Sequence, residues 1–92
     1  MLSFLPKNPY QMQEDIKTRF RDKRKALNYT QKELSQRSGV SLGSLKRFEQ
    51  SGEISLNSLL RVALVLECLE DFEKVCLPKE KMPKSIKELL DD

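Results

Sequence analysis

The sequence predicts an all-α protein built from five short helices, with a further short helix near its C-terminal end. Three observations lead to this prediction. Apolar residues recur at three- and four-residue intervals through most of the chain, as they do on one face of a helix. Residues that cap helices precede several of these segments, and no strand pattern is visible. At 92 residues and 38% apolar content, the chain is expected to form one small domain.

The N-terminal region is expected to contain an arm followed by the first helix. Residues 1–11 show no helical periodicity and contain two prolines, so they are predicted to form an N-terminal arm. The folded domain is expected over residues 12–77. Its first helix is predicted over residues 13–28, with a periodic apolar face that includes one charged residue, Arg24. Asn28 is expected to end this helix, because asparagine tolerates the left-handed conformation.

The next three helices share one type of N-terminus and are predicted over residues 30–38, 41–51 and 55–66. Each begins at a hydroxyl residue whose apolar neighbours have the spacing of a hydrophobic staple, and the first also has a capping-box glutamate. Glycines follow the first two of these helices, where a left-handed residue commonly ends a helix. The predicted caps are Thr30, Ser41 and Ser55, and the helix-ending glycines are Gly39 and Gly52.

The helix predicted over residues 55–66 is apolar nearly all round, which raises the question of what covers its second face. The stripe of Leu56, Leu60 and Leu64 is expected to lie on one side, and a second apolar stripe lies away from it. A fifth helix, capped by Asp71, or another subunit is expected to cover that second stripe. We predict a homodimer interface formed by Val62, Val65, Leu69 and Phe72.

The C-terminal residues are predicted to leave the domain. Pro78 interrupts the chain, and residues 78–92 are expected to form a linker and a short terminal helix. Residues 85–88, Ser-Ile-Lys-Glu, have the pattern of a capping box, which marks the start of that helix.

The charges are unevenly distributed along the chain. Residues 12–52 hold ten Lys and Arg against five Asp and Glu, whereas residues 53–92 hold six against nine. A basic front half favours an anionic polymer as the partner of one face. Solvated charges on ordinary helices account for the same balance, so charge alone does not decide between the two interpretations.

The composition argues against catalysis. The chain has no histidine, and two cysteines alone make a poor metal site. We therefore expect a non-enzymatic protein without a metal or cofactor. Neither a signal-peptide pattern nor an apolar run of about 18 residues is present. A cytoplasmic protein is thus expected, in which Cys68 and Cys76 stay reduced and act as small apolar residues.

Two of the predicted helices, residues 30–38 and 41–51, are separated only by a tight glycine-containing turn. This layout is typical of a helix-turn-helix, whose second helix reads double-stranded DNA. Helical hairpins without a DNA-binding function have the same layout, so a protein-interaction module is the alternative. The exposed face of the second helix is expected to carry Leu42, Gly43, Ser44, Lys46 and Arg47.

The sequence resembles the DNA-binding domain of phage repressors and Cro proteins, the Xre family, over about residues 14–69. The likeness lies in residues 30–35 (Thr-Gln-Lys-Glu-Leu-Ser), 38–41 (Ser-Gly-Val-Ser), Leu45 and the pair Phe48-Glu49. This resemblance implies a five-helix, lambda-repressor-like domain whose third helix enters the major groove. It also implies a two-fold homodimer that represses transcription from an inverted-repeat operator.

The resemblance assigns roles to individual residues. The positions that match the family's base-reading residues are Leu42, Gly43, Ser44 and Arg47. Gly43 departs from the amide side chains common at its position. For Leu42 a core or interface contact is the alternative, and for Arg47 a phosphate contact.

Other positions are expected to contact the DNA backbone or to hold the fold together. The predicted phosphate contacts are Gln31, Lys46, Lys23 and Lys25, with ordinary solvated side chains as the alternative. Arg24 and Glu49 match a family pair that joins the first and third helices, so they are predicted to form a structural ion pair.

A looser resemblance links the chain to small antitoxins that are paired with Hip-type kinase toxins. It rests on residues 43–49 (Gly-Ser-Leu-Lys-Arg-Phe-Glu) and 52–56 (Gly-Glu-Ile-Ser-Leu). This likeness implies an autorepressor of a toxin–antitoxin operon, with a kinase-like toxin or co-subunit as a further partner. A stand-alone phage or bacterial regulator of the Xre family is the alternative.

Overall fold

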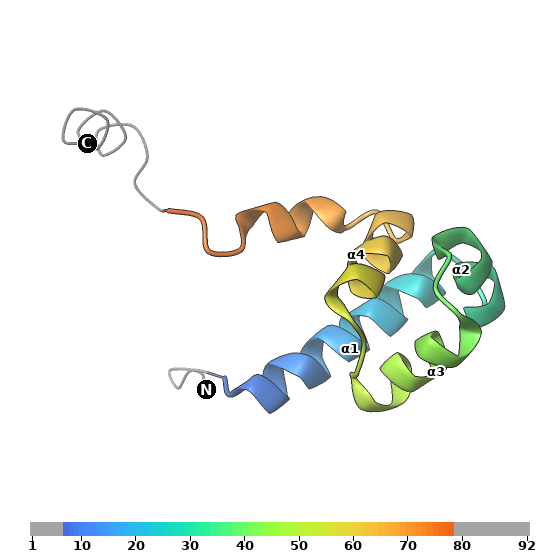
Figure 1. Cartoon of the computed structure of the whole chain (residues 1–92), viewed down its shortest axis with the longest axis horizontal. Helices are drawn as coiled ribbons and strands as arrows, with labels where there is room; N and C mark the ends of the chain where they lie inside the picture. Colours follow the sequence, from blue (N-terminus) through green and yellow to red (C-terminus); the bar gives the residue numbers. More distant parts are fainter. Residues whose placement is uncertain (1–6, 79–92) are drawn as a thin grey trace.

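The computed structural model describes residues 7–78, which form four α-helices and one 3₁₀-helix (Figure 1). They are α1 (Pro9–Ala26), α2 (Gln31–Ser38), α3 (Leu42–Ser51), α4 (Leu56–Val65) and η1 (Leu69–Lys74). The described residues contain no strand, and the prediction of an all-α, five-helix domain is confirmed. Most of the predicted arm, and nearly all of the predicted linker and terminal helix, lie outside the described residues.

Helix α1 begins four residues earlier than predicted, so the expected arm boundary at residue 11 is wrong. Asn8 caps the helix, because its side-chain oxygen accepts a hydrogen bond from the Gln11 amide at 2.7 Å. Pro9 occupies the first helical position, where the missing N–H costs nothing and the fixed φ suits a helix. At the other end Asn28 adopts a left-handed conformation with φ 63°, as the sequence predicted.

Helices α2, α3 and α4 begin at the predicted caps. The hydroxyls of Thr30, Ser41 and Ser55 accept hydrogen bonds from backbone amides three residues later, at 3.0–3.1 Å. Both glycines that follow α2 and α3 are left-handed, with φ 77° for Gly39 and 82° for Gly52. These helix boundaries are therefore confirmed, because each depends on groups only a few residues apart.

The fifth helix differs from its prediction. It is a 3₁₀-helix that starts at Leu69, and Asp71 lies inside it without capping it. The left-handed residue Glu67, with φ 65°, ends α4 and turns the chain directly into η1. Phe72 packs on α1, where its ring meets the Phe20 ring edge-on at 6.4 Å between centroids. Val75, which follows η1, is 64% exposed.

The core lies between the helices and draws at least one side chain from each α-helix. Helix α3 packs against α1 and α2, and α4 packs against α2 and η1 (Figure 1). The rings of Phe20 and Phe48 join α1 to α3 at 5.7 Å between centroids. The buried apolar residues are Phe20, Leu34, Val40, Leu45, Phe48, Val62, Ala63 and Leu66.

The face of α4 that enters the core overlaps only in part with the one predicted, since Ala63 is buried as expected while the stripe of Leu56, Leu60 and Leu64 lies beside the buried face. Val62 is only 1% exposed within a single chain, so its expected place in a dimer interface is wrong. Leu56 and Leu64, expected to face inward, are 67% and 63% exposed. Both stripes of α4 are apolar, so the hydrophobic pattern did not distinguish them. The small Ala63 side chain belongs to the inward face and permits close packing against the neighbouring helices.

Candidate DNA interface

The turn between α2 and α3 is held by side chains that bind its backbone. The Ser35 hydroxyl donates to the Val40 carbonyl at 2.6 Å, and the Val40 amide donates to the Ser38 hydroxyl at 3.1 Å. Arg61 of α4 donates to the Gly39 carbonyl at 3.1 Å. Because the turn's polar groups are paired locally and from α4, the two helices form one rigid hairpin.

Helix α3 presents an exposed strip on the outside of this hairpin. Gly43, Ser44 and Arg47 are exposed on the strip with Lys46 beside them, while Leu42 is half-buried at its edge. Four of these five expected residues are therefore freely accessible. The Ser44 hydroxyl accepts a hydrogen bond from the Ser41 hydroxyl at 2.9 Å, which leaves its own proton available to an outside acceptor.

Arg47 binds an acidic residue, Glu53, and the sequence did not predict this contact. Its Nε donates to Glu53 Oε1 at 3.0 Å, and its Nη2 donates to the same oxygen. Glu53 lies in the link between α3 and α4, and both side chains are largely exposed. Ser44, Arg47 and Glu53 line one shallow hollow, together with the start of α4.

Arg24 and Glu49 form the predicted ion pair at the junction of three helices. Arg24 donates from Nε to Glu49 Oε2 at 2.7 Å and from Nη2 to Oε1 at 3.0 Å. Both side chains are about nine-tenths buried. Arg24 Nη1 also donates to the Tyr29 carbonyl at 2.8 Å, so the pair joins α1, α3 and the loop before α2.

Gln31 at the start of α2 takes part in the same network. Its side-chain amide donates to Glu49 Oε1 at 2.9 Å, which fixes the direction of the amide group. An amide nitrogen carries two hydrogens, so one remains for an outside acceptor. The Glu49 carboxylate beside it is neutralised by Arg24, so an approaching anion meets little repulsion there.

The C-terminal end of α3 is tied to α1 by two contacts that the sequence did not reveal. The Gln13 amide donates to the Gly52 carbonyl at 2.8 Å, and Lys17 donates to the Gln50 carbonyl at 3.2 Å. These groups satisfy carbonyls that have no partner within the helix. Residues 39 and 33 positions apart in the chain meet here, and no local pattern marks such a contact.

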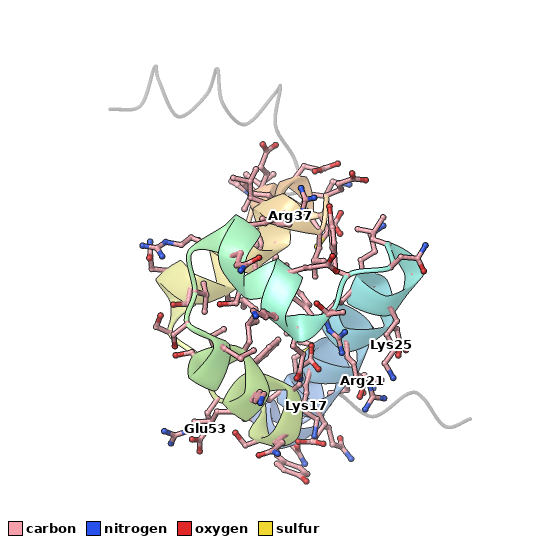
Figure 2. All side chains as sticks on the ribbon, turned by 90° about the vertical axis from the view of Figure 1, so that its right-hand side faces the viewer. Lys17, Arg21, Lys25, Arg37 and Glu53 are labelled. Carbon is pink, nitrogen blue, oxygen red and sulfur yellow. The ribbon has the colours of Figure 1, made fainter. Side chains whose placement is uncertain are left out.

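A row of cations runs along α1 beside the hairpin. Lys17, Arg21 and Lys25 are four residues apart and follow one edge of the helix (Figure 2). Of the three, only Lys25 was predicted as a phosphate contact, although the four-residue spacing was visible in the sequence. Lys23 lies elsewhere: it borders a hollow with Cys68 and Phe72, about 200° around the helix from Lys25. The structure therefore does not bring Lys23 together with the other expected phosphate contacts.

The cysteines lie away from the hairpin. Burial raises the pKa of the half-buried Cys68 thiol, and the nearby Asp71 carboxylate adds to this effect. The thiol therefore stays protonated at neutral pH, which makes it a poor nucleophile or metal ligand. Cys76 is exposed on the chain after η1. Within residues 7–78, no three Cys, Asp or Glu side chains gather as metal ligands would.

Comparisons with known proteins identify the family. A family model described as helix-turn-helix matches residues 20–72, more than half of the chain. The search of curated proteins and the search of solved structures each gave no match. None of the helices in residues 7–78 has the length and apolar character needed to cross a membrane. The matched residues run from the middle of α1 into η1 and include the whole α2–α3 hairpin, so the chain belongs to the helix-turn-helix family of DNA-binding transcription regulators.

Proposed function

We propose that this protein is a sequence-specific repressor that binds double-stranded DNA with α3 in the major groove. The observation that carries the proposal is the exposed strip of Gly43, Ser44 and Arg47 on a hairpin held rigid by its turn. An α-helix fits the major groove, where each base pair presents a distinct pattern of donors and acceptors. A repressor acts by occupying its operator, so these contacts are sufficient for the activity.

Each residue of the strip has a chemical role in this proposal. Arg47 donates a fork of hydrogen bonds to guanine O6 and N7, and Ser44 donates its free proton to a base acceptor. Leu42, half-buried at the edge of the strip, contacts a thymine methyl group. Gly43 has no side chain, and a Cβ there would have no protein neighbour within 4 Å, so packing within the fold does not require a glycine at this position. In this proposal the helix backbone approaches the bases most closely at Gly43.

Backbone contacts orient the protein on the duplex. Gln31 offers its remaining amide hydrogen to a phosphate at the N-terminal end of α2, where the helix dipole favours an anion. Lys46 on α3 and Lys25 on α1 supply two further exposed positive charges for phosphate contacts. Arg21 extends this exposed charge along α1 and acts in the same way (Figure 2). Lys17 does not, because its side chain is only 17% exposed and its ammonium group is paired with Glu14 at 2.7 Å. Such contacts supply affinity for any DNA sequence.

Selection from random double-stranded oligonucleotides, followed by binding measurements over a range of salt concentrations, tests the proposal. We expect one enriched motif, and an affinity for it that falls steeply as salt rises, because counterions are released on binding. Binding with no enriched motif would limit the function to general DNA association. An absence of salt-dependent DNA binding would instead favour a protein-interaction module.

We further propose that the protein acts as a homodimer on an inverted-repeat operator. The exposed apolar residues Leu64 on α4 and Val75 after η1 support such a contact, since their side chains are 63% and 64% exposed. Three other residues that were expected in the interface are half-buried against the core and lie between these two positions in the chain: Val65, Leu69 and Phe72. A two-fold dimer presents two recognition helices about 34 Å apart, one turn of DNA.

We also propose that the operon it represses is a toxin–antitoxin operon with a Hip-type kinase toxin. The support is the likeness of residues 43–49 and 52–56 to antitoxins of that group. Two observations test this: a kinase-like gene beside this one, and co-purification of its product with this protein after joint expression. A neighbouring gene of another kind, and no complex with a Hip-type kinase, would favour a stand-alone regulator of the Xre family.

A further inference from the structure

The guanidinium group of Arg47 is occupied on one edge and free on another. Its Nε and Nη2 both donate to Glu53 Oε1, and these two nitrogens form one side of the planar group. A guanidinium carries five N–H donors in a rigid fork. The edge formed by Nη1 and Nη2 therefore keeps a complete pair of donors. A guanine presents its O6 and N7 acceptors to such a pair.

Glu53 is itself held in place by the backbone around it. Its amide donates to the Ser51 hydroxyl at 3.2 Å, and that hydroxyl donates to the Arg47 carbonyl at 2.8 Å. The preceding residue, Gly52, is left-handed, and its carbonyl accepts the hydrogen bond from Gln13 of α1. Arg47 and Glu53 are thus connected through Ser51 as well as through their side chains.

The contact between Arg47 and Glu53 adds little to the stability of the fold. The two side chains are 71% and 58% exposed, and ion pairs between exposed groups are weak because water and salt screen them. In contrast, the direction of the Arg47 side chain matters for a bidentate contact with a base. A long side chain that is already oriented loses less conformational freedom when it binds.

We propose that Glu53 determines specificity by orienting Arg47, so that the free Nη1 and Nη2 edge meets a guanine. This inference rests on the proposed DNA-binding function. The glutamate has a second, opposite effect, because its negative charge repels phosphates and lowers the affinity for every DNA sequence. Glu53 therefore lowers the affinity for all DNA sequences and raises the discrimination at one base pair.

The variant Glu53→Gln separates these two effects, because glutamine has nearly the same shape without the charge. We measure dissociation constants for three duplexes: the selected site, the same site with the preferred guanine replaced, and a random sequence. We expect the preference for guanine to fall roughly three- to tenfold, part of the about five- to 150-fold that a complete bidentate contact supplies. Binding to random DNA is expected to be equal or tighter.

Two further variants complete the test. Glu73→Gln makes the same charge change on η1 and should leave the guanine preference unchanged. In an Arg47→Ala background, Glu53→Gln should have no effect on that preference. Circular dichroism melting confirms that each variant is folded.

Three outcomes would overturn the inference. Equal tightening on all duplexes would mean that Glu53 acts only as a charge. A stronger guanine preference in Glu53→Gln would mean that Glu53 competes with the base for Arg47. A loss of preference that persists without Arg47 would place the effect on another residue. Failure of the proposed DNA-reading function can be distinguished from these three outcomes, because the wild-type protein would then enrich no motif in the selection from random oligonucleotides.

Discussion

Single substitutions of Arg47 on α3 and of Lys25 on α1 are expected to distinguish base reading from phosphate binding. Arg47→Ala is expected to cost about 1–3 kcal/mol of binding free energy on the selected site and to relax the preference at one base pair. Lys25→Ala should weaken binding to every sequence alike and lower the salt slope by about one unit. Fluorescence anisotropy titrations at several salt concentrations measure both effects. Equal losses for Arg47→Ala on selected and random DNA would make it a phosphate contact.

Two glycines of the hairpin region should respond oppositely to the same substitution. Gly43 lies inside α3, and a Cβ there would meet nothing within 4 Å, so Gly43→Ala should stabilise the fold by up to about 1 kcal/mol. Gly52 is left-handed, and a Cβ there would lie 2.8 Å from the Gln13 side chain. Gly52→Ala should therefore destabilise the fold by more than about 1 kcal/mol. Urea unfolding of both variants measures the difference.

Gly43→Ala also tests the role of its backbone in DNA binding. If α3 approaches the bases most closely at this position, the stabilised variant should bind the selected site more weakly than the wild-type protein. An unchanged affinity would show that the groove has room for a methyl group there. The stability measurement stays informative in either case, since it is made without DNA.

At the scale of whole helices, one buried carboxylate joins α3 to both α1 and α2. Glu49 binds Arg24 of α1 and Gln31 of α2, and its side chain is 7% exposed. Glu49→Ala leaves the buried Arg24 charge without its partner, which is expected to cost about 3–5 kcal/mol of unfolding free energy. Glu70→Ala, at an exposed position of η1, is the control and should change stability little. Similar melting temperatures for the two variants would contradict a structural role for the pair.

At the scale of the whole molecule, the two stripes of α4 predict different outcomes for the same substitution. Val62→Asp puts a carboxylate into the core of one chain, at 1% exposure, so the domain should lose its fold. Leu64→Asp changes a residue that is 63% exposed, so the monomer should stay folded while the proposed dimer dissociates. Light scattering after size exclusion, together with circular dichroism, measures mass and fold.

The dimer proposal has a clear contrary result. A wild-type protein that stays monomeric at micromolar concentration and still binds its operator tightly would exclude it. A Leu64→Asp variant with the mass of a dimer would instead place the contact elsewhere on the surface. Half-site spacing in the selected motif provides a separate check, because a two-fold dimer requires an inverted repeat.

Features that depend on neighbouring residues could be predicted from the sequence. The caps at Thr30, Ser41 and Ser55 and the left-handed Gly39 and Gly52 were predictable, because each involves groups only a few residues apart. The Arg24–Glu49 pair is a longer-range contact, and the family resemblance indicated it. The start of α1 does not follow from the sequence pattern alone, because proline is common in irregular chain and also suits the first position of a helix, where Pro9 lies.

Which side chains meet across the molecule depends on how all the helices pack together. Both stripes of α4 are apolar, so packing against the other helices, and not the pattern, selected Val62 for the core and left Leu64 exposed. The hydrogen bonds from Gln13 and Lys17 to the end of α3 join residues more than 30 positions apart. The contact between Arg47 and Glu53 depends on how the chain turns after Gly52. Helix starts follow from local hydrogen bonding, whereas the inward face of a helix and its long-range polar partners follow from the packing of all the helices together.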